Sequence, residues 1–158
     1  MRRKDKEITD IRQIEDILNK GKFCHISMAS KDEPYLVTVN YGYKNNSIYF
    51  HSAPDGQKID MIRKNPKVCF MVYTDDQIVS GENPCRDWSV KYRSVIGYGK
   101  ATILENPVEK LQGLNILMEH YSKKGSFDFN EKNLEETIVV KIEIEKISGK
   151  VSGYDKEG

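Results

Sequence analysis

The feature that most constrains the fold is a stretch of alternating apolar and polar residues between positions 22 and 52. The segments KFCHISMA, YLVTVNYGY and SIYFHS alternate in this way, and the turn-type sequences KDEP and KNNS separate them. Alternation places successive side chains on opposite faces of a strand, and short polar turns connect antiparallel neighbours. The stretch therefore predicts an antiparallel meander of three strands.

The remainder of the chain predicts further strands and helices. Residues 67–73, KVCFMVY, are apolar on both faces, which is typical of a central buried strand, whereas residues 75–89 are polar and are expected to form a loop. Gly97 and Gly99 lie within the next strand pattern, where they indicate a bend or a close backbone approach. We expect helices at 8–21, 56–64 and 106–121, and further strands at 67–73, 90–104 and 137–144.

This content of elements predicts a mainly β fold. About six antiparallel strands with flanking helices favour a small closed or partly closed barrel, because closure removes exposed strand edges. The 158 residues suffice for a hydrophobic core, and no repeat or long linker divides them. We therefore expect a single domain over residues 1–158.

Composition narrows the classes of function. The net charge is +1 and acidic and basic residues are mixed along the chain, which argues against nucleic acid or a membrane surface as a partner. No apolar segment has the length of a membrane span or a signal sequence, so we expect a cytoplasmic protein. The spacing of the three cysteines and three histidines predicts no metal site. Cys24 and Cys69 fit buried strand positions, and Cys85 lies in a polar loop.

The first candidate site is the segment YFHSAPDGQK, in which a strand ending at His51 leads to a helix start at Gly56. A helix start offers unpaired backbone N–H groups and the positive end of the helix dipole, which suits a phosphate. Lys58 adds a full positive charge there, and Ser52 and Gln57 add hydrogen-bond donors. The alternative is an ordinary helix start with a solvent-exposed lysine.

The second candidate site consists of polar residues in two strand patterns, VTVN at 37–40 and KYRS at 91–94. Thr38 and Asn40 share one strand face, opposite the apolar Val37 and Val39, and would serve as hydrogen-bond donors to a heterocycle. An apolar pocket with a few convergent polar groups is the usual form of a small-molecule site. The alternative for 91–94 is a plain surface face. The nearby Trp88 fits a core anchor better than a ring-stacking lid.

Two segments of the chain resemble a known family. YFHSAPDGQKIDMIRKNPKVCF resembles the phosphate-binding segment of the pyridoxamine 5′-phosphate oxidase-like FMN-binding split barrels. CRDWSVKYRSVIGYGKA is similar to the nitroimidazole-resistance (Nim-type) branch of that family. The residues that match are His51, Ser52, Ala53, Gly56, Lys58, Asn65 and Pro66 in the first segment, and Cys85, Trp88, Tyr92, Ser94, Val95, Gly97 and Ala101 in the second.

The resemblance implies a split β-barrel homodimer that binds FMN between its subunits. Lys58 and Gln57, with Ser52, would hold the phosphate. His51 would lie near the flavin ring. The remaining contacts to the flavin would come from Val37, Thr38, Val39 and Asn40, and from Tyr92, Arg93 and Ser94, the last three from the neighbouring chain.

The function implied is that of an FMN-dependent oxidoreductase acting on a small organic substrate such as a nitro compound, with His51 as the proton donor. The C-terminal sequence ISGKVSGYDKEG lacks the basic and aromatic segment with which the oxidase proper grips pyridoxal phosphate, so vitamin B6 oxidation is not expected. His25 and His120 are assigned to structural and surface roles. Two alternatives stay open: a flavin-binding redox sensor without turnover, and a haem-binding split barrel.

Overall fold

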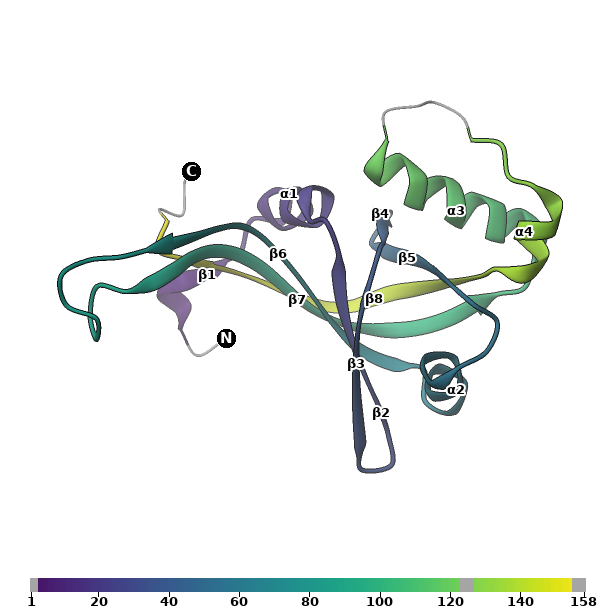
Figure 1. The fold of residues 1–158 in the computed structure, drawn as a ribbon, viewed down its shortest axis with the longest axis horizontal. Coiled ribbons are helices and arrows are strands. Elements are labelled where there is room, and N and C mark those ends of the chain that lie inside the picture. The colour runs from purple at the N-terminus through teal and green to yellow at the C-terminus, as the bar shows by residue number, and fades with distance from the viewer. Residues whose placement is uncertain (1–2, 123–126, 155–158) are drawn as a thin grey trace.

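The computed structural model describes residues 3–122 and 127–154, in which one antiparallel sheet carries all the strands (Figure 1). The order along the sheet is β3-β2-β6-β7-β8-β5-β4, and β1 pairs with β8. The strands are β1 (Glu7–Ile8), β2 (Cys24–Ser30), β3 (Glu33–Val39), β4 (Gly42–Lys44), β5 (Ser47–Ser52), β6 (Lys67–Val79), β7 (Ser89–Leu104) and β8 (Ile138–Ser152). The sheet is strongly coiled but not closed, so the predicted split barrel of antiparallel strands is confirmed.

Within the described ranges, five helical segments flank this sheet. They are the 3₁₀ turn η1 (Lys4–Lys6), α1 (Ile11–Lys20), α2 (Gln57–Lys64), α3 (Pro107–Tyr121) and α4 (Glu131–Glu136). Helix α1 packs against β6 and β7, α2 packs against β2, and α3 lies across β4 and β5. The predicted start of α3 is confirmed, because the side chain of Asn106 accepts hydrogen bonds from the N–H groups of Val108 and Glu109.

Some predicted boundaries were wrong. Helix α1 begins after Asp10, whose side chain caps it, and Ile8 instead belongs to β1, paired with Gly149. The described residues also form eight strands where the sequence predicted about six, because Ile8 of β1 was assigned to a helix and the predicted strand at 35–43 divides into β3 and β4. Strands β3 and β4 lie at opposite ends of the strand order, so the prediction of a three-stranded meander was wrong. The short helix α4 was not predicted.

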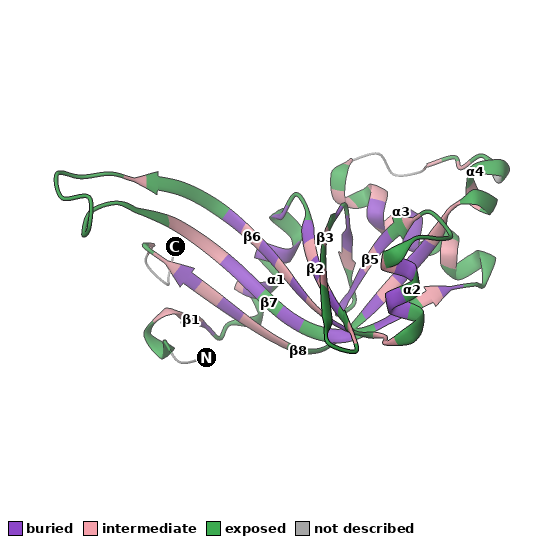
Figure 2. Ribbon diagram, turned by 60° about the horizontal axis from the view of Figure 1, so that its bottom comes forward, coloured by how far each residue is buried: buried purple, intermediate pink, exposed green. Residues whose placement is uncertain are grey.

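The largest correction concerns residues 75–89, which were predicted to be a loop. Strands β6 and β7 continue as a two-stranded ribbon through the pairs Gln77–Lys91, Ile78–Val90 and Val79–Ser89. This ribbon and its connecting loop, which we call the arm (residues 75–91), project beyond the rest of the sheet (Figure 1). A bulge between Thr74 and Gln77 interrupts the pairing at the base of the arm. The arm is exposed over most of its length (Figure 2), so it lacks the apolar alternation by which a half-buried strand is recognised.

The main core lies between the inner face of the sheet and helices α1 and α2. The predicted row of Cys24, Ile26 and Met28 is buried there, together with Phe70 and Val72 of β6. Strand β6 is central, as predicted, but only one of its faces is fully buried. Its other face carries Cys69, Met71 and Tyr73, which are half-buried, and we call that side of the sheet the outer face. Prediction of a strand buried on both sides was therefore wrong.

Two glycines of β7 allow the close approaches that the sequence indicated. A Cβ atom on Gly97 would lie 2.2 Å from the ring of Phe70, its partner on β6. A Cβ atom on Gly99 would lie 2.2 Å from the carbonyl oxygen of Glu143 on β8, beside a register shift between these strands. Both positions exclude larger side chains unless the neighbours move.

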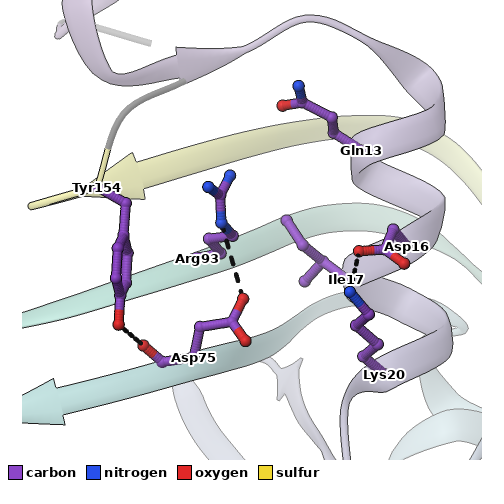
Figure 3. Close-up of a pocket in the computed structure, with 7 residues that line it drawn as sticks. All are labelled: Gln13, Asp16, Ile17, Lys20, Asp75, Arg93 and Tyr154. Atoms are coloured by element: carbon purple, nitrogen blue, oxygen red, sulfur yellow. Dashed lines mark hydrogen bonds and ion pairs between the residues drawn. The ribbon is translucent and has the colours of Figure 1, made fainter. Parts of the chain in front are cut away.

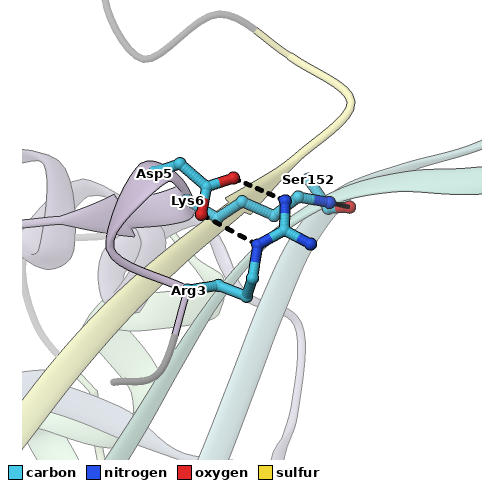
Figure 4. Close-up of polar contacts among 4 residues, drawn as sticks. All are labelled: Arg3, Asp5, Lys6 and Ser152. Carbon is cyan, nitrogen blue, oxygen red and sulfur yellow. Dashed lines mark hydrogen bonds and ion pairs between the residues drawn. The ribbon is translucent and has the colours of Figure 1, made fainter.

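The N-terminal segment is fastened to the end of the sheet (Figure 4). Lys6 donates a hydrogen bond to the hydroxyl of Ser152 at 3.2 Å, and the pairing of β1 with β8 lies beside this contact. Within η1, the guanidinium of Arg3 contacts the carboxylate of Asp5 at 2.8 and 2.5 Å. The Lys6–Ser152 contact and the pairing of β1 hold residues 6–8 beside the end of β8.

Candidate functional site

The N-terminus of α2 forms a corner that can accept an anion. Gly56 precedes the helix with a φ of +106°, and a Cβ atom added there would meet nothing within 4 Å. No side chain caps the helix. Its first N–H groups are therefore available to a ligand, and the positive end of the helix dipole lies at the same point.

Lys58 lies in the first turn of this helix and is half-buried. Its Nζ atom is 5.5 Å from the centre of the Phe50 ring. Burial lowers the pKa of this ammonium below its ordinary value of 10.5, and no neighbouring charge contributes to the shift. Among the described residues, no carboxylate forms an ion pair with it. A partly desolvated cation without a counter-charge is the feature of this corner that most clearly points to an anionic ligand.

The two residues at the end of β5 point in opposite directions. Ser52 and Phe50 share one strand face, which is the face that Lys58 covers. His51 is on the other face, where it lines a cavity of about 240 Å³ beneath α3 together with Leu117, Phe129 and other residues of α3 and the following segment. The structure thus brings Ser52 to the side of Lys58 and turns His51 away from it.

The predicted ring-binding strand β3 forms one edge of the sheet. Val37 and Val39 pack toward the core, and Thr38 and Asn40 are exposed. The hydroxyl of Thr38 lies 3.0 Å from Nδ1 of His25. The ring of His25 is parallel to that of Tyr73, with centroids 6.0 Å apart. His25 therefore orients the hydroxyl of a predicted site residue, a role that the sequence did not indicate.

Tyr92 and Ser94 lie on the outer face, on the same side of the sheet as Tyr73. They line a cavity of about 320 Å³ with Tyr73, Ile96, Lys150 and three further residues. Lys150 donates a hydrogen bond to the hydroxyl of Tyr92 at 2.6 Å. Lys150 was not among the predicted site residues, because only the register between β7 and β8 brings it beside Tyr92.

Arg93 does not join this group. It lies on the opposite face of β7, beside Asp75 and Tyr154 (Figure 3). Thr38 and Ser94 do share the outer face, but they are three strands apart, which corresponds to about 14 Å at the usual strand spacing. One chain alone therefore does not gather the predicted residues into a single pocket.

Three other predicted positions have clear surroundings. Trp88 is exposed in the loop of the arm and donates a hydrogen bond to the carbonyl of Gly81, so the prediction of a core anchor was wrong. His120 contacts the carbonyl of Gly21 at 2.6 Å, which is a structural role. Cys85 is exposed in the same loop as Trp88.

Within residues 3–122 and 127–154, no three His, Cys, Asp or Glu side chains are grouped closely enough to hold a metal ion. None of the helices in these ranges is long and apolar enough to cross a bilayer.

The helix start at Gly56, the edge strand β3 and the coiled antiparallel sheet were all expected from the resemblance to one family. The model of the family described as pyridoxamine 5′-phosphate oxidase matches residues 10–151. The chain belongs to this family. Family membership confirms the resemblance inferred from residues 49–70 and 85–101, and it accounts for the split-barrel architecture.

Solved structures and one curated protein give further likenesses. A candidate 5-nitroimidazole antibiotic resistance protein of Bacteroides thetaiotaomicron VPI-5482 is 30% identical, with 92% of this chain and 86% of that chain covered and a TM-score of 0.81. An uncharacterized protein of Rhizobium meliloti (strain 1021) is 33% identical over 60 residues, which span 38% of this chain and 39% of that protein.

More distant structures share the fold. The flavocytochrome Anf3 of Azotobacter vinelandii is 18% identical, with 98% of this chain and 72% of that chain covered and a TM-score of 0.83. An FAD- and haem-binding protein of Mycobacterium smegmatis is 16% identical, with coverages of 94% and 74% and a TM-score of 0.82. Proteins of this architecture thus include binders of flavin and of haem.

Proposed function

We propose that this protein is an FMN-dependent oxidoreductase that works as a homodimer and reduces a small organic substrate, such as a nitro compound. The observation that carries the proposal is the half-buried Lys58 ammonium, which has no counter-charge among the described residues and lies at an uncapped helix start. The family and the likeness to a candidate nitroimidazole resistance protein support the same function.

The residues at the corner fit the phosphate of FMN. A phosphate needs several N–H donors and at least one cation, and it needs space close to the backbone. The first N–H groups of α2, the ammonium of Lys58, the side chain of Gln57 and the open position at Gly56 meet these needs. The hydroxyl of Ser52 lies on the same side of β5 and adds a donor.

FMN, when bound, would supply the two-electron transfer to the substrate. The protein's own contribution is to hold, orient and protonate. We assign the flavin ring to the edge of β3, where residues 37–40 combine an apolar inner side with the exposed polar groups of Thr38 and Asn40. His51 remains the candidate proton donor, since histidine is the usual side chain for proton transfer near neutral pH. Because it faces the cavity beneath α3, its role would concern the substrate and not the phosphate.

A second copy of the chain would complete the site. The outer face exposes an apolar stripe that runs from Ile78 and Val90 on the arm to Ile96 and Tyr98 on the sheet. Contiguous apolar surface of this kind marks interfaces. Tyr92 and Ser94 lie along the same stripe, so an association through it would bring them to the flavin of the other copy.

Two measurements test the proposal. Absorption and mass spectra of the ligand that purifies with the protein should identify FMN, and reduced flavin should then be reoxidised by an aromatic nitro compound. A Soret band without flavin would instead support the haem-binding alternative. Bound FMN without turnover of any nitro compound would support a redox sensor and contradict the reductase.

Light scattering tests the homodimer separately. Ile96→Lys puts a charge into the apolar stripe and should shift the protein from dimer to monomer. Ile11→Lys is a matched control, because Ile11 is also exposed but lies on α1, away from the stripe. A monomeric wild-type protein, or a variant that dimerises as well as the wild type, would contradict the assignment of this face.

A further inference from the structure

The cavity on the outer face of the sheet combines apolar walls with one polar end. Its lining residues come from β6, β7 and β8, and the side chains of Met71, Val90 and Ile96 form its walls together with the rings of Tyr73 and Tyr92. Its volume of about 320 Å³ lies at the small end of the usual range for ligand sites, about 300–1,000 Å³. A cavity of this size suits a single substituted ring better than a dinucleotide.

Ser94 supplies an unpartnered hydroxyl at the polar end. The residue is only 7% exposed, and within residues 3–122 and 127–154 its side chain makes no hydrogen bond to another residue. In the same ranges, every fully enclosed side-chain nitrogen or oxygen atom has a partner, so this hydroxyl is open to the cavity that Ser94 lines. Polar groups this deeply buried normally have a hydrogen-bond partner. The hydroxyl therefore points to a ligand atom in the cavity.

Lys150 adds a positive charge beside this hydroxyl. It is the partner of Ser94 across β7 and β8, and side chains paired in this way are close neighbours on one face of a sheet. Its ammonium donates a hydrogen bond to the hydroxyl of Tyr92 at 2.6 Å, which occupies one of three N–H donors. Among the residues that the structure describes, no carboxylate forms an ion pair with it. Its charge is thus not neutralised at this end of the cavity.

The three polar groups at this end act as hydrogen-bond donors. Because the hydroxyl of Tyr92 accepts from Lys150, its own proton is available to another acceptor. Ser94 and the remaining N–H groups of Lys150 can donate to the same acceptor. Donors that converge beside a positive charge recognise the oxygens of an anion, since charge-assisted hydrogen bonds are the stronger ones.

The carboxylate of Asp76 also lines the cavity but lies on its other side. Asp76 belongs to the bulge of β6, whereas Lys150 is on β8, and β7 runs between them. At the usual strand spacing the two strands are about 10 Å apart. Asp76 therefore leaves Lys150 free to meet a ligand, and its own charge disfavours a ligand with two negative charges.

We propose that this cavity holds an aromatic monocarboxylate as substrate, with its carboxylate at Lys150, Tyr92 and Ser94 and its ring between the apolar walls. Lys150 would then determine the preference for a charged substrate. The inference rests on the proposed function, in which association through the apolar stripe places this cavity beside the flavin of the other copy. The preferred nitro compound is accordingly an aromatic one that carries a carboxylate.

Steady-state reduction of 4-nitrobenzoate and of uncharged nitrobenzene by the FMN-loaded protein tests this preference. The wild type should have an about tenfold lower KM for 4-nitrobenzoate, the effect of one charge-assisted hydrogen bond. Lys150→Met should remove that difference while leaving kcat and the KM for nitrobenzene unchanged, whereas a merely structural role would affect both substrates. Ser94→Ala should weaken 4-nitrobenzoate binding less. It keeps the test valid if Lys150→Met unfolds, because the hydroxyl that it removes has no partner to lose.

Calorimetric titration with sodium benzoate measures binding without turnover. We expect one saturable site per chain, weakened about tenfold in Lys150→Met. Lys146→Met is the matched control, because Lys146 is exposed on the same face of β8 but does not line the cavity, and it should bind benzoate as the wild type does.

The outcomes separate this inference from the proposed function. If benzoate binds as expected but no nitro compound is reduced, the proposed function fails and the ligand class stands. If the wild type reduces 4-nitrobenzoate and nitrobenzene with equal KM, the inference fails and the reductase stands. The inference is also overturned if Lys146→Met weakens benzoate binding as much as Lys150→Met does, or if Ser94→Ala lowers FMN content without changing benzoate affinity.

Discussion

Replacing Lys58 by methionine should weaken FMN binding strongly while leaving the unliganded fold intact. In the wild type the ammonium is half-buried, and burial alone accounts for the lowering of its pKa. The desolvation of this charge is therefore not offset by a neighbouring carboxylate. The phosphate of FMN would provide the missing counter-charge, so the lysine contributes to affinity more than to the stability of the free protein.

The expected size of the effect follows from these contacts. Loss of one charge-assisted hydrogen bond to phosphate costs about 1.5–3 kcal/mol, which corresponds to about a 10- to 150-fold rise in Kd. In the free protein, methionine keeps the apolar contact with Phe50 and removes a desolvated charge. The loss of a cation–π contact, about 0.5–1 kcal/mol, acts in the other direction. We therefore expect a net change in the free energy of unfolding within about 1 kcal/mol.

Flavin fluorescence titrations and urea unfolding measure the two quantities separately. Lys64→Met is the matched control, because Lys64 is exposed in the last turn of the same helix, and it should leave FMN affinity unchanged. Riboflavin, which lacks the phosphate, should bind the wild type and Lys58→Met equally. Equal FMN affinity of the two proteins, or a similar loss for riboflavin, would refute the assignment of the phosphate to this corner.

The pH dependence of stability provides an independent check on Lys58. Its pKa is lowered in the folded protein, so the unfolded chain binds the proton more tightly. The contribution of Lys58 to the free energy of unfolding of the unliganded protein should therefore rise with pH, between the pKa in the folded protein and the ordinary value of 10.5. Lys58→Met should lack this rise, which is visible as a difference between the two unfolding profiles.

Three further predictions concern other parts of the chain. His51→Ala should retain FMN, because His51 faces away from Lys58, but should slow nitro reduction in steady-state assays; unchanged turnover would exclude proton transfer by His51. Burial raises the pKa of Cys24 from 9.0 to about 12, so its contribution to stability is lost as pH rises through that interval. Cys24→Ala should therefore make the alkaline decline in unfolding free energy shallower by up to about 1.4 kcal/mol per pH unit, and an unchanged slope would contradict this. Gly97→Ala should destabilise the protein by about 1–3 kcal/mol through contact with Phe70, and Phe70→Leu in the same chain should recover part of that loss in urea unfolding; additive effects would show that the two sites are not coupled.

Local patterns in the sequence were sufficient for most of the elements. The alternation of Cys24, Ile26 and Met28 predicted both a strand and its buried face, because one side of β2 packs on the core. The caps at Asp10 and Asn106 and the end of α2 before Pro66 follow from short-range chemistry of the backbone. The helix start at Gly56 was also predictable, because its unpaired N–H groups and the charge of Lys58 suit an anion regardless of where the helix packs.

Prediction from the sequence was wrong for strands that have no buried face and for faces whose burial depends on other elements of the fold. The arm carries no apolar alternation, because it is exposed on most of its length, and only the pairing of Ile78 with Val90 reveals it. Strand β6 has an apolar sequence on both faces, yet its outer face is only half-buried. An apolar sequence alone does not show whether another layer of the chain covers that face.

For the candidate site, the sequence by itself determined which residue types are available, and the tertiary structure decided which of them act together. Lys58 was recognised from its place in the chain, but its burial and the lack of a neighbouring carboxylate come from the packing of α2 against β2 and of the Lys58 side chain over Phe50. Arg93 was grouped with Tyr92 because they are adjacent, and the sheet separates them because neighbouring residues of a strand point to opposite faces. The cavity that Tyr92 shares with Lys150 depends on the register between β7 and β8, because only that register brings the two side chains together.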